Sequence, residues 1–390
     1  MNIAILTNHF PPYRGGISRY TYEIAYHLKQ HGANLTVFSS VPPKEQTNNL
    51  HSEFSGQFVY LPFSGKGYWE AFRVFKRCLS LAKQEEIDLL FFSKWTPYAL
   101  FAPFFPFSRN RYVVGTHGAE ILDLLNRESK TRPIIRWMGC YALRNAQVIF
   151  AVSNYTAHQL SKLQVPNSRI QVFPNGVDYT IFTPQTVDKE EFLSQYPIDN
   201  PSLPLLLTVA QLNPRKGIDN TLRAVANLIS KGREVNYVVI GKGEDESRLR
   251  GIIKRMGLEG YSYIFTDISD EELLKFYNIS NAFILFSRKE GSENIEGFGI
   301  ALLEANACGI PVIAGRSGGI PDAVVDGETG FLLDPLDIEA LAMTIKLLLE
   351  NPEQARLLGK QGRERIVEEY NWEKITSNML TTLKQTFNKS

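Results

Sequence analysis

The chain has 390 residues, which exceeds what one hydrophobic core usually serves, so we expect two domains. Its 42 basic and 41 acidic side chains give a formal net charge of +1, a balance that argues against a nucleic-acid partner. The three cysteines, Cys78, Cys140 and Cys308, show no paired spacing, so we expect a reducing, cytoplasmic compartment rather than a disulfide framework.

Two segments could be mistaken for membrane signals. The amino terminus, MNIAILTNHF, lacks the basic region and the long apolar stretch of a secretory signal. Residues 89–107 are apolar, but they include Lys94 and several prolines, which would interrupt a spanning helix. We therefore expect a buried strand over residues 87–92 followed by a loop, in a chain that is soluble or at most attached to a membrane surface.

Short β-rich runs alternate with longer amphipathic stretches in the first half of the chain. After the strand NIAILT and a glycine-rich turn, Ile17, Tyr20, Ile24 and Leu28 recur at helical spacing. Further strands are predicted over residues 35–40, 87–92, 111–116 and 147–153, and further helices over residues 68–84, 133–145 and 154–164. Because these strands are apolar throughout, we expect a parallel sheet that is covered on both faces.

The turn-rich segment FPNGVDYTIFTP, residues 173–184, marks a junction, after which the alternation begins again. Strands are predicted over residues 205–210, 235–241, 261–266, 282–287 and 310–315, and helices over residues 218–231, 244–257, 270–280, 299–308 and 337–349. The fold class is therefore α/β, with two doubly wound, Rossmann-like domains at residues 1–178 and 179–370. Such sheets bind ligands beyond the carboxyl ends of their strands, so we expect the site in a cleft between the domains.

In the first domain, two loops that follow strands carry candidate ligand contacts. Gly15 and Gly16 precede the first helix, whose free amides and partial positive charge suit a phosphate. His117 follows the strand at residues 111–116, where its side chain would meet a ligand. The glycine pair could equally be a structural turn, and the histidine could satisfy local backbone groups. We predict no zinc site.

In the second domain, a basic pair and two glutamates are the candidates. Arg215 and Lys216 follow the strand at residues 205–210 and could neutralise a diphosphate. The stretch EGFGIALLE contains two glycines that weaken a helix interior, so we place Glu296 in a loop and start the helix near Gly299. Glu304 then lies one turn into that helix, and both glutamates could bind sugar hydroxyls.

The run YVVIGKGEDE suggests a dinucleotide fingerprint. It follows a strand and supplies Gly241 and Gly243, but Glu246 occupies the position of the third glycine. No clear acidic residue ends the next strand either, where the sequence reads YSYIFTDIS. An NAD-dependent oxidoreductase is therefore disfavoured.

The sequence resembles the retaining glycosyltransferases of family 4 over nearly its whole length, in the motifs GGISRY, THG, FPNGVD, PRKG, EGFGIALLEANACGIPVIAG, SGGIPD, DGETGFLL and YNWEKI. Glu296 and Glu304 form the E-x7-E pattern of that family. The resemblance implies the GT-B fold, in which two Rossmann-like domains face each other. It also implies that a C-terminal helix, residues 371–390, crosses back onto the first domain.

The resemblance further implies a set of site residues. It gives catalytic roles to His117, Arg215, Lys216 and Glu296, and donor contacts to Gly15, Gly16, Gln211, Ile268, Phe298, Gly299, Ile300 and Glu304. Within this set, Glu304 would bind the ribose and the backbone near Ile268 would receive the base. Gln211 stands where the family usually has arginine, so either Arg215 takes over that charge or the donor is held differently. No metal ion is implied.

The implied reaction moves a hexose, with retention, from GDP-mannose or a UDP-hexose to a hydroxyl of a glycan, lipid or lipid-linked acceptor. Two rivals stay open: a catalytically impaired nucleotide-sugar-binding protein, and a GT-B nucleotide-sugar epimerase. Residues 68–83 mix aromatic and basic side chains and, with the basic segment 128–144, could rest on anionic lipid at the inner face of the membrane. The alternative is a core-facing helix with a solvated basic face.

Overall fold

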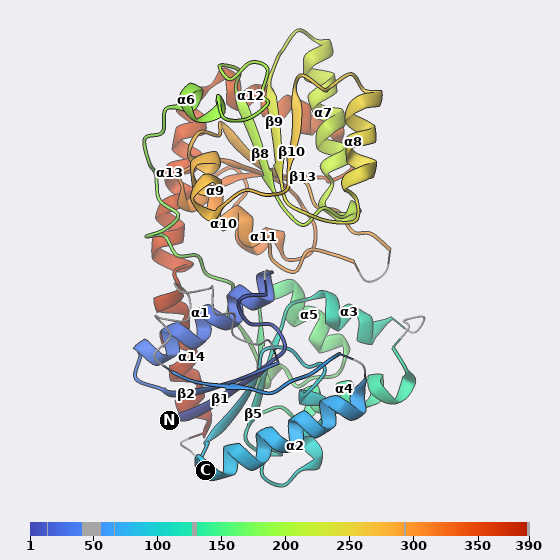
Figure 1. Cartoon of the computed structure of the whole chain (residues 1–390), viewed down its shortest axis with the longest axis vertical. Coiled ribbons are helices and arrows are strands. Elements are labelled where there is room, and N and C mark those ends of the chain that lie inside the picture. Colours follow the sequence, from blue (N-terminus) through green and yellow to red (C-terminus); the bar gives the residue numbers. More distant parts are fainter. Residues whose placement is uncertain (14, 41–55, 66, 127–130, 292–293, 388–390) are drawn as a thin grey trace. The chain divides into compact units, whose positions relative to one another are not determined.

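The computed structural model describes residues 1–13, 15–40, 56–65, 67–126, 131–291 and 294–387 (Figure 1). The chain divides into two compact units. Unit 1 comprises Met1–Asn175 and Trp372–Ser390, and unit 2 comprises Gly176–Asn371. Each is built around its own parallel sheet.

Unit 1 is a seven-stranded sheet with its helices. The strands are β1 (Asn2–Thr7), β2 (Asn34–Ser39), β3 (Gln57–Tyr60), β4 (Leu89–Phe92), β5 (Tyr112–Thr116), β6 (Val148–Ala151) and β7 (Ile170–Val172). The helices are α1 (Gly16–Gln30), α2 (Tyr68–Gln84), the 3-10 helix η1 (Ala99–Phe104), α3 (Ala119–Leu125), α4 (Pro133–Asn145), α5 (Asn154–Lys162), the 3-10 turn η2 (Asn167–Arg169) and α14 (Trp372–Phe387).

The strand order of this sheet is β3-β2-β1-β4-β5-β6-β7. The chain winds outward from β1 in one direction and from β4 in the other, which is the doubly wound arrangement predicted from the sequence. The order reverses between β1 and β4, which pair in parallel from Ile3 with Leu89 to Leu6 with Phe92. Loops that leave these two strands therefore meet at one edge of the sheet.

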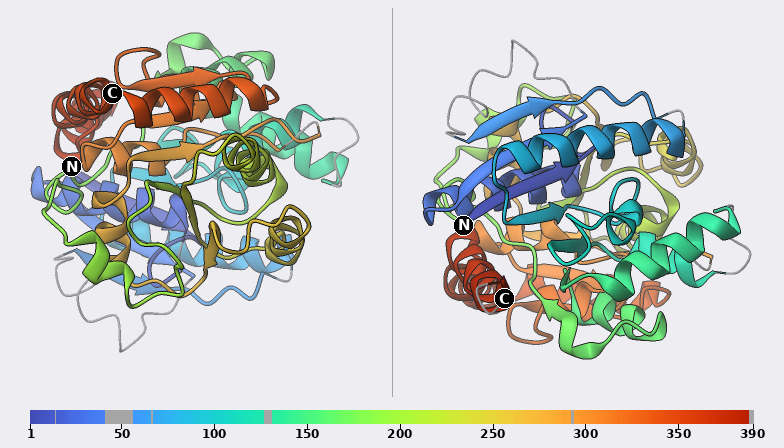
Figure 2. Two further views of the ribbon diagram at one scale, coloured as in Figure 1. Left: turned by 90° about the horizontal axis from the view of Figure 1, so that it is seen from above. Right: turned by 90° about the horizontal axis from the view of Figure 1, so that it is seen from below.

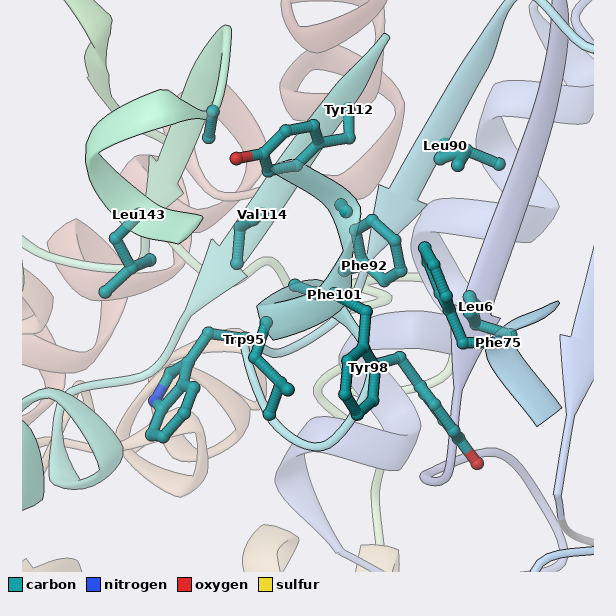
Figure 3. Packing of buried hydrophobic residues seen from close by; sticks show 14 of the residues in the cluster. Leu6, Phe75, Leu90, Phe92, Trp95, Tyr98, Phe101, Tyr112, Val114 and Leu143 are labelled. Carbon is teal, nitrogen blue, oxygen red and sulfur yellow. The ribbon is translucent and has the colours of Figure 1, made fainter. Parts of the chain in front are cut away.

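The core of unit 1 contains α2, η1 and α4 packed on the same side of the sheet (Figures 1 and 2). Figure 3 shows Phe75 of α2 and Phe101 of η1 beside Phe92, with Trp95 and Tyr98 closing the group. The indole of Trp95 donates a hydrogen bond of 3.2 Å to the carbonyl of Glu120. Residues after β4 were predicted to form a loop, but their apolar side chains fold into η1 and fill this core.

The last helix of the chain, α14, belongs to unit 1. It lies along α1 (Figure 1), and the ring centroids of Tyr20 and Trp372 are 6.1 Å apart. The imidazole Nε2 of His31 lies 2.9 Å from the carbonyl oxygen of Glu373. Trp372 and Met379 are buried, so α14 is part of the core of this unit.

Unit 2 repeats the same plan with six strands in the order β10-β9-β8-β11-β12-β13. The strands are β8 (Leu205–Val209), β9 (Asn236–Ile240), β10 (Ser262–Phe265), β11 (Ala282–Leu285), β12 (Val312–Gly315) and β13 (Gly330–Leu333). The helices are α6 (Lys189–Leu193), the 3-10 turn η3 (Pro214–Lys216), α7 (Ile218–Ser230), α8 (Glu246–Arg255), α9 (Asp270–Asn278), α10 (Ile300–Ala307), α11 (Ile320–Ala323), α12 (Ile338–Glu350) and α13 (Pro352–Glu369). Here the strand order reverses between β8 and β11.

Most predicted elements lie within a few residues of those observed, and the predicted pair of parallel, doubly wound sheets is confirmed. Three strands were not predicted: β3, β7 and β13. Among the helices of the described residues, none is both long enough and apolar enough to cross a membrane.

Candidate functional site

Unit 2 carries two adjacent cations in a tight turn after its first strand. Beyond β8, the amide of Leu212 donates to the carbonyl of Lys242, and the chain then enters η3 with Arg215 and Lys216. Gly217 ends the turn in the left-handed region, with φ of 67°. A Cβ atom at this position would lie 2.0 Å from the carbonyl oxygen of Phe286. Only glycine fits, because both the dihedral angle and the close approach of the backbone exclude a side chain.

Glu296 accepts hydrogen bonds from both cations. Its Oε2 atom lies 2.6 Å from Nη1 of Arg215 and also accepts from Nζ of Lys216. Its backbone is held as well, since its carbonyl accepts from the amide of Gly319 at 2.9 Å. Glu296 is 9% exposed. The three side chains therefore form a largely buried cluster with an excess of positive charge.

The cluster keeps Glu296 ionised. Burial alone would raise its pKa, but the charges of Lys216 and Arg215 outweigh burial and hold the pKa at about 2. Burial lowers the pKa of Lys216, and the carboxylate of Glu296 opposes that effect. Arg215 is the second cation that contacts the same carboxylate oxygen.

The position of this cluster follows from the strand order of unit 2. Arg215 and Lys216 follow β8, and Glu296 lies between β11 and α10. These two strands flank the point at which the order reverses, where loops leave in opposite directions and open a crevice for ligands. The amide of Arg288, just beyond β11, donates to the carbonyl of Arg215 at 2.8 Å and joins the two loops.

Four of the other predicted residues of unit 2 lie at or near the start of α10. Gly299 precedes this helix in the left-handed region, with φ of 97°, and Ile300 is its first residue. The ring of Phe298 is buried, with its centroid 6.0 Å from that of Tyr370. Glu304 is partly buried in the second turn, where its Oε2 accepts a hydrogen bond of 2.8 Å from the hydroxyl of Tyr277.

Two further residues predicted from the resemblance lie in other loops of this unit. Gln211 is exposed in the loop after β8, and Ile268 is partly buried between β10 and α9. Neither is joined to the cluster by a hydrogen bond that we observe among the described residues.

The predicted residues of unit 1 lie at the carboxyl end of its sheet. Gly15 directly precedes α1, which begins at Gly16. Gly15 has no side chain to cap the first amides of this helix, and its first turn contains no acidic residue. This end of α1 consequently has the electrostatic character that attracts anions.

His117 follows β5, and its imidazole is fixed by the backbone just beyond the neighbouring strand β4. Its Nε2 atom lies 2.8 Å from the carbonyl oxygen of Ser93. A carbonyl oxygen can only accept, so Nε2 carries the proton and Nδ1 is left as an acceptor. Burial lowers the pKa of His117 and outweighs the opposing charge of Glu120. The side chain is therefore a neutral imidazole that can accept a hydrogen bond.

Two residues beside His117 were not among the predicted site residues. The ring of Tyr20 meets that of His117 edge to face, with centroids 4.8 Å apart. His9, beyond β1, has its pKa lowered to about 4, chiefly by burial and then by the nearby charge of Lys94. The sequence indicated both only by position: His9 follows the first predicted strand, and Tyr20 lies in the GGISRY motif.

Among the described residues, no group of three or more histidine, cysteine, aspartate or glutamate side chains is arranged to hold a metal ion.

Two parallel, doubly wound sheets with charged and glycine-containing loops at their switch points define an α/β protein of the kind that binds phosphorylated ligands. Comparison with known families agrees. Residues 14–180 match the family described as Glycosyltransferase Family 4, and residues 188–365 match Glycosyl transferases group 1. The chain belongs to the group 1 glycosyltransferases of family 4, which have the GT-B fold, and it is a glycosyltransferase.

Curated relatives match most of the chain. A GDP-mannose-dependent alpha-(1-6)-phosphatidylinositol monomannoside mannosyltransferase of Mycolicibacterium smegmatis is 29% identical over 373 residues, or 95% of both chains. An N-acetyl-alpha-D-glucosaminyl L-malate synthase of Bacillus anthracis is 26% identical over 304 residues, or 77% of this chain and 75% of the relative. Among solved structures, HepE of Anabaena in complex with UDP-glucose superposes with a TM-score of 0.80 at 19% identity, covering 99% of this chain and 100% of HepE.

Proposed function

We propose that the protein is a retaining hexosyltransferase, which moves a mannose- or glucose-type sugar from a nucleoside-diphosphate sugar to an acceptor hydroxyl without a metal ion. The observation that carries this proposal is the cluster of Arg215, Lys216 and Glu296 at the switch point of unit 2. Two fixed cations there could receive the negative charge that develops on a departing diphosphate.

In this mechanism, the bond between the anomeric carbon and the diphosphate oxygen breaks as the acceptor oxygen attacks from the same face of the sugar. The acceptor's proton passes to the departing phosphate. Arg215 and Lys216 share their hydrogen bonds between Glu296 and the diphosphate, and Glu296 also accepts from hydroxyls of the transferred sugar. The cations are already positioned, so little reorganisation is needed when charge develops.

The other predicted residues have subsidiary roles in the proposal. The amides at Phe298, Gly299 and Ile300 support the diphosphate, Glu304 binds the ribose, and the backbone near Ile268 receives the base. In unit 1, the amides at Gly15 and Gly16 are proposed to bind an anionic group, and the Nδ1 atom of His117 to accept a hydrogen bond from a sugar hydroxyl. Gln211 is neutral, so Arg215 supplies the charge that arginine provides in the usual family pattern.

GDP-mannose is the preferred donor in this proposal because the mannosyltransferase of M. smegmatis is matched over 95% of its length. UDP-glucose follows, given the ligand of HepE. The acceptor is a lipid, lipid-linked or glycan hydroxyl.

An exposed aromatic and basic face on unit 1 supports an acceptor at an anionic lipid surface. On α4 and η1, Trp137 stacks on Tyr141 with centroids 5.5 Å apart, and Phe104 stacks on the same tyrosine at 5.4 Å. On α2, the rings of Trp69 and Phe72 are stacked at 5.5 Å. Arg73, Lys76 and Arg77 are exposed on α2, and Arg132 and Arg144 are exposed at the ends of α4. Residues 128–130 of the basic segment predicted from the sequence lie outside the described residues.

The donor is tested by incubating the purified protein with GDP-mannose, UDP-glucose, UDP-galactose and ADP-glucose, with phosphatidylinositol and simple glycosides as acceptors. Transfer or slow hydrolysis of one donor, with the α-linkage of the donor retained in the product, is the expected result. An isomerised donor would instead indicate an epimerase. Binding of nucleotide sugars with no turnover would indicate the second candidate, a catalytically impaired binding protein, which Gln211 favours.

A further inference from the structure

An ion-pair network with two buried aspartates, Asp219 and Asp245, adjoins the turn that carries Arg215 and Lys216 in unit 2. Arg288, just beyond β11, donates two hydrogen bonds to Asp219, from Nη1 to Oδ1 at 2.8 Å and from Nη2 to Oδ2 at 3.0 Å. Asp219 is 6% exposed and lies in the first turn of α7, where the helix dipole favours a negative charge. Arg248 of α8 contacts the same carboxylate at 3.4 Å and is itself held by Asp245.

The network joins the turn through the backbone of Arg288. Its amide donates to the carbonyl of Arg215 at 2.8 Å, while its guanidinium is held by Asp219. One residue thus connects the first turn of α7 to the residue that carries a proposed catalytic cation. Gly217, packed on Phe286, fixes the same turn from its other end. We propose that Asp219 and Arg288 are positioning residues, which hold Arg215 and Lys216 where both reach one oxygen of Glu296.

The chemistry makes such positioning valuable. Two cations that share one carboxylate oxygen repel each other, so they keep this arrangement only if the backbone beneath them is fixed. A displacement of about 1 Å in a catalytic group can lower a rate about a hundredfold. This inference rests on the proposed function, in which Arg215 and Lys216 stabilise the departing diphosphate.

The first experiment measures transfer kinetics for Asp219→Asn and Arg288→Gln. Each change is expected to lower kcat between about tenfold and a hundredfold, while KM for the acceptor stays unchanged. The double variant should be no slower than either single variant, because both remove one pair. Arg288→Lys keeps a cation but loses the bidentate contact, so its kcat should lie between those of the natural chain and of Arg288→Gln. Glu339→Gln is the matched control, since it breaks the exposed pair with Lys231 in the same unit.

The second experiment does not depend on activity. Glutamate labelled with ¹³C at the side-chain carboxyl allows the ionisation of Glu296 to be followed by NMR, with its signal assigned by its absence in Glu296→Gln. In Asp219→Asn and in Arg288→Lys the pKa of Glu296 is expected to move from about 2 toward 4.5, because Arg215 and Lys216 move away from its carboxylate. Glu339→Gln should leave the pKa of Glu296 unchanged.

An unmoved midpoint in folded Asp219→Asn and Arg288→Lys, or transfer rates equal to those of Glu339→Gln, would overturn the positioning role. If the unaltered protein turns over no donor but its Glu296 midpoint responds to these changes, the proposed function fails and the positioning role stands.

Discussion

At the scale of single residues, the proposed chemistry depends on how Glu296 is compensated. A buried carboxylate is costly in isolation, and it is tolerated here because two cations contact the same oxygen. The reverse also holds, since Arg215 and Lys216 would be largely buried positive charges without it. Removing one of the three side chains therefore leaves the buried charge of the others less well compensated, which lowers the free energy of unfolding.

Glu296→Gln should destabilise unit 2 by about 3 kcal/mol, because it leaves two cations without a counter-charge. Transfer should fall as well. Urea unfolding measures the first effect and the donor assay the second. Glu339→Gln, at an exposed pair, should cost less than about 1 kcal/mol. Equal costs for the two variants would contradict a stabilising role for the cluster.

The stabilisation by Glu296 should also depend on pH. Its pKa is about 2 in the folded chain against an ordinary value of 4.5, so the folded state favours the ionised form. A lowered carboxyl pKa adds stability that is complete above the ordinary value and is lost as the pH falls through the folded value. The difference in unfolding free energy between the natural chain and Glu296→Gln should accordingly narrow from about pH 4.5 down to about pH 2. A constant difference over this range would be inconsistent with the charge pairing.

The sequence allowed Arg215, Lys216 and Glu296 to be selected as candidates, because each lies in a loop after a strand. It did not reveal the pair of Asp219 and Arg288. These two are 69 positions apart in the chain and belong to no spacing pattern. Contacts of this kind depend on which loops the strand order brings together. Neither the composition nor the periodicity of the sequence indicates which loops become neighbours.

At the scale of elements, the backbone of the turn Pro214–Gly217 determines where the side chains of Arg215 and Lys216 lie. Gly217 is packed against the backbone of Phe286, so the turn is locked to the end of β11. The strands that lead into this region were predictable because each is an unbroken apolar run. By contrast, β7 has only three residues, two of them exposed, and α13 is largely polar with two glycines among its buried positions. Neither has the periodicity that identifies an element.

Gly217→Ala should displace the cationic turn, because its Cβ would overlap the carbonyl oxygen of Phe286 at 2.0 Å. Gly232→Ala is a matched control: its φ of 76° is close to the 67° of Gly217, but nothing lies within 4 Å of its Cβ. The control should lose about 1 kcal/mol from the dihedral angle alone. Gly217→Ala should lose at least about 2 kcal/mol more and reduce transfer strongly. Urea unfolding and the donor assay of both variants check this, and equal losses would show that the contact with Phe286 is unimportant.

At the scale of the whole molecule, the chain leaves unit 1 at Asn175 and returns to it at Trp372. The fold class and the doubling of the sheet followed from the repeated alternation of strands and helices. The return of α14 was implied by the family resemblance, since an amphipathic helix at a terminus does not itself say which core it joins. Its contact with α1 makes the two ends of the chain parts of one core.

Met379→Ala should therefore destabilise unit 1 although it lies far along the sequence from most of that unit. Met379 is fully buried in α14, and truncation of such a side chain costs about 2–5 kcal/mol. Hydrogen exchange should accelerate in α1 and the strands of unit 1 and remain unchanged in α7 and β8. Asn378→Ala, on the exposed side of the same helix, should have little effect. Faster exchange throughout unit 2 would contradict the assignment of α14 to unit 1.

The aromatic and basic face of unit 1 leads to the last prediction. Trp69 is 71% exposed and Trp137 is 56% exposed, and both lie among exposed cations of α2 and α4. Indole rings partition into the interface of a bilayer, while the cations are attracted to anionic headgroups. The protein should sediment with phosphatidylglycerol vesicles but less with phosphatidylcholine vesicles, and added salt should release it.

The double variant Trp69→Ala/Trp137→Ala should lose most of this binding, and Arg73→Glu/Arg77→Glu should lose its dependence on lipid charge. Leu336→Ala is the control, because Leu336 is also 71% exposed but lies in unit 2. If all variants sediment alike, or if the two lipids bind equally, the face is a solvated surface and the acceptor need not be presented at a membrane. Binding that depends on both the indole rings and the lipid charge would instead indicate that the protein binds its acceptor at the lipid surface, while the donor is bound by the loops that follow the strands.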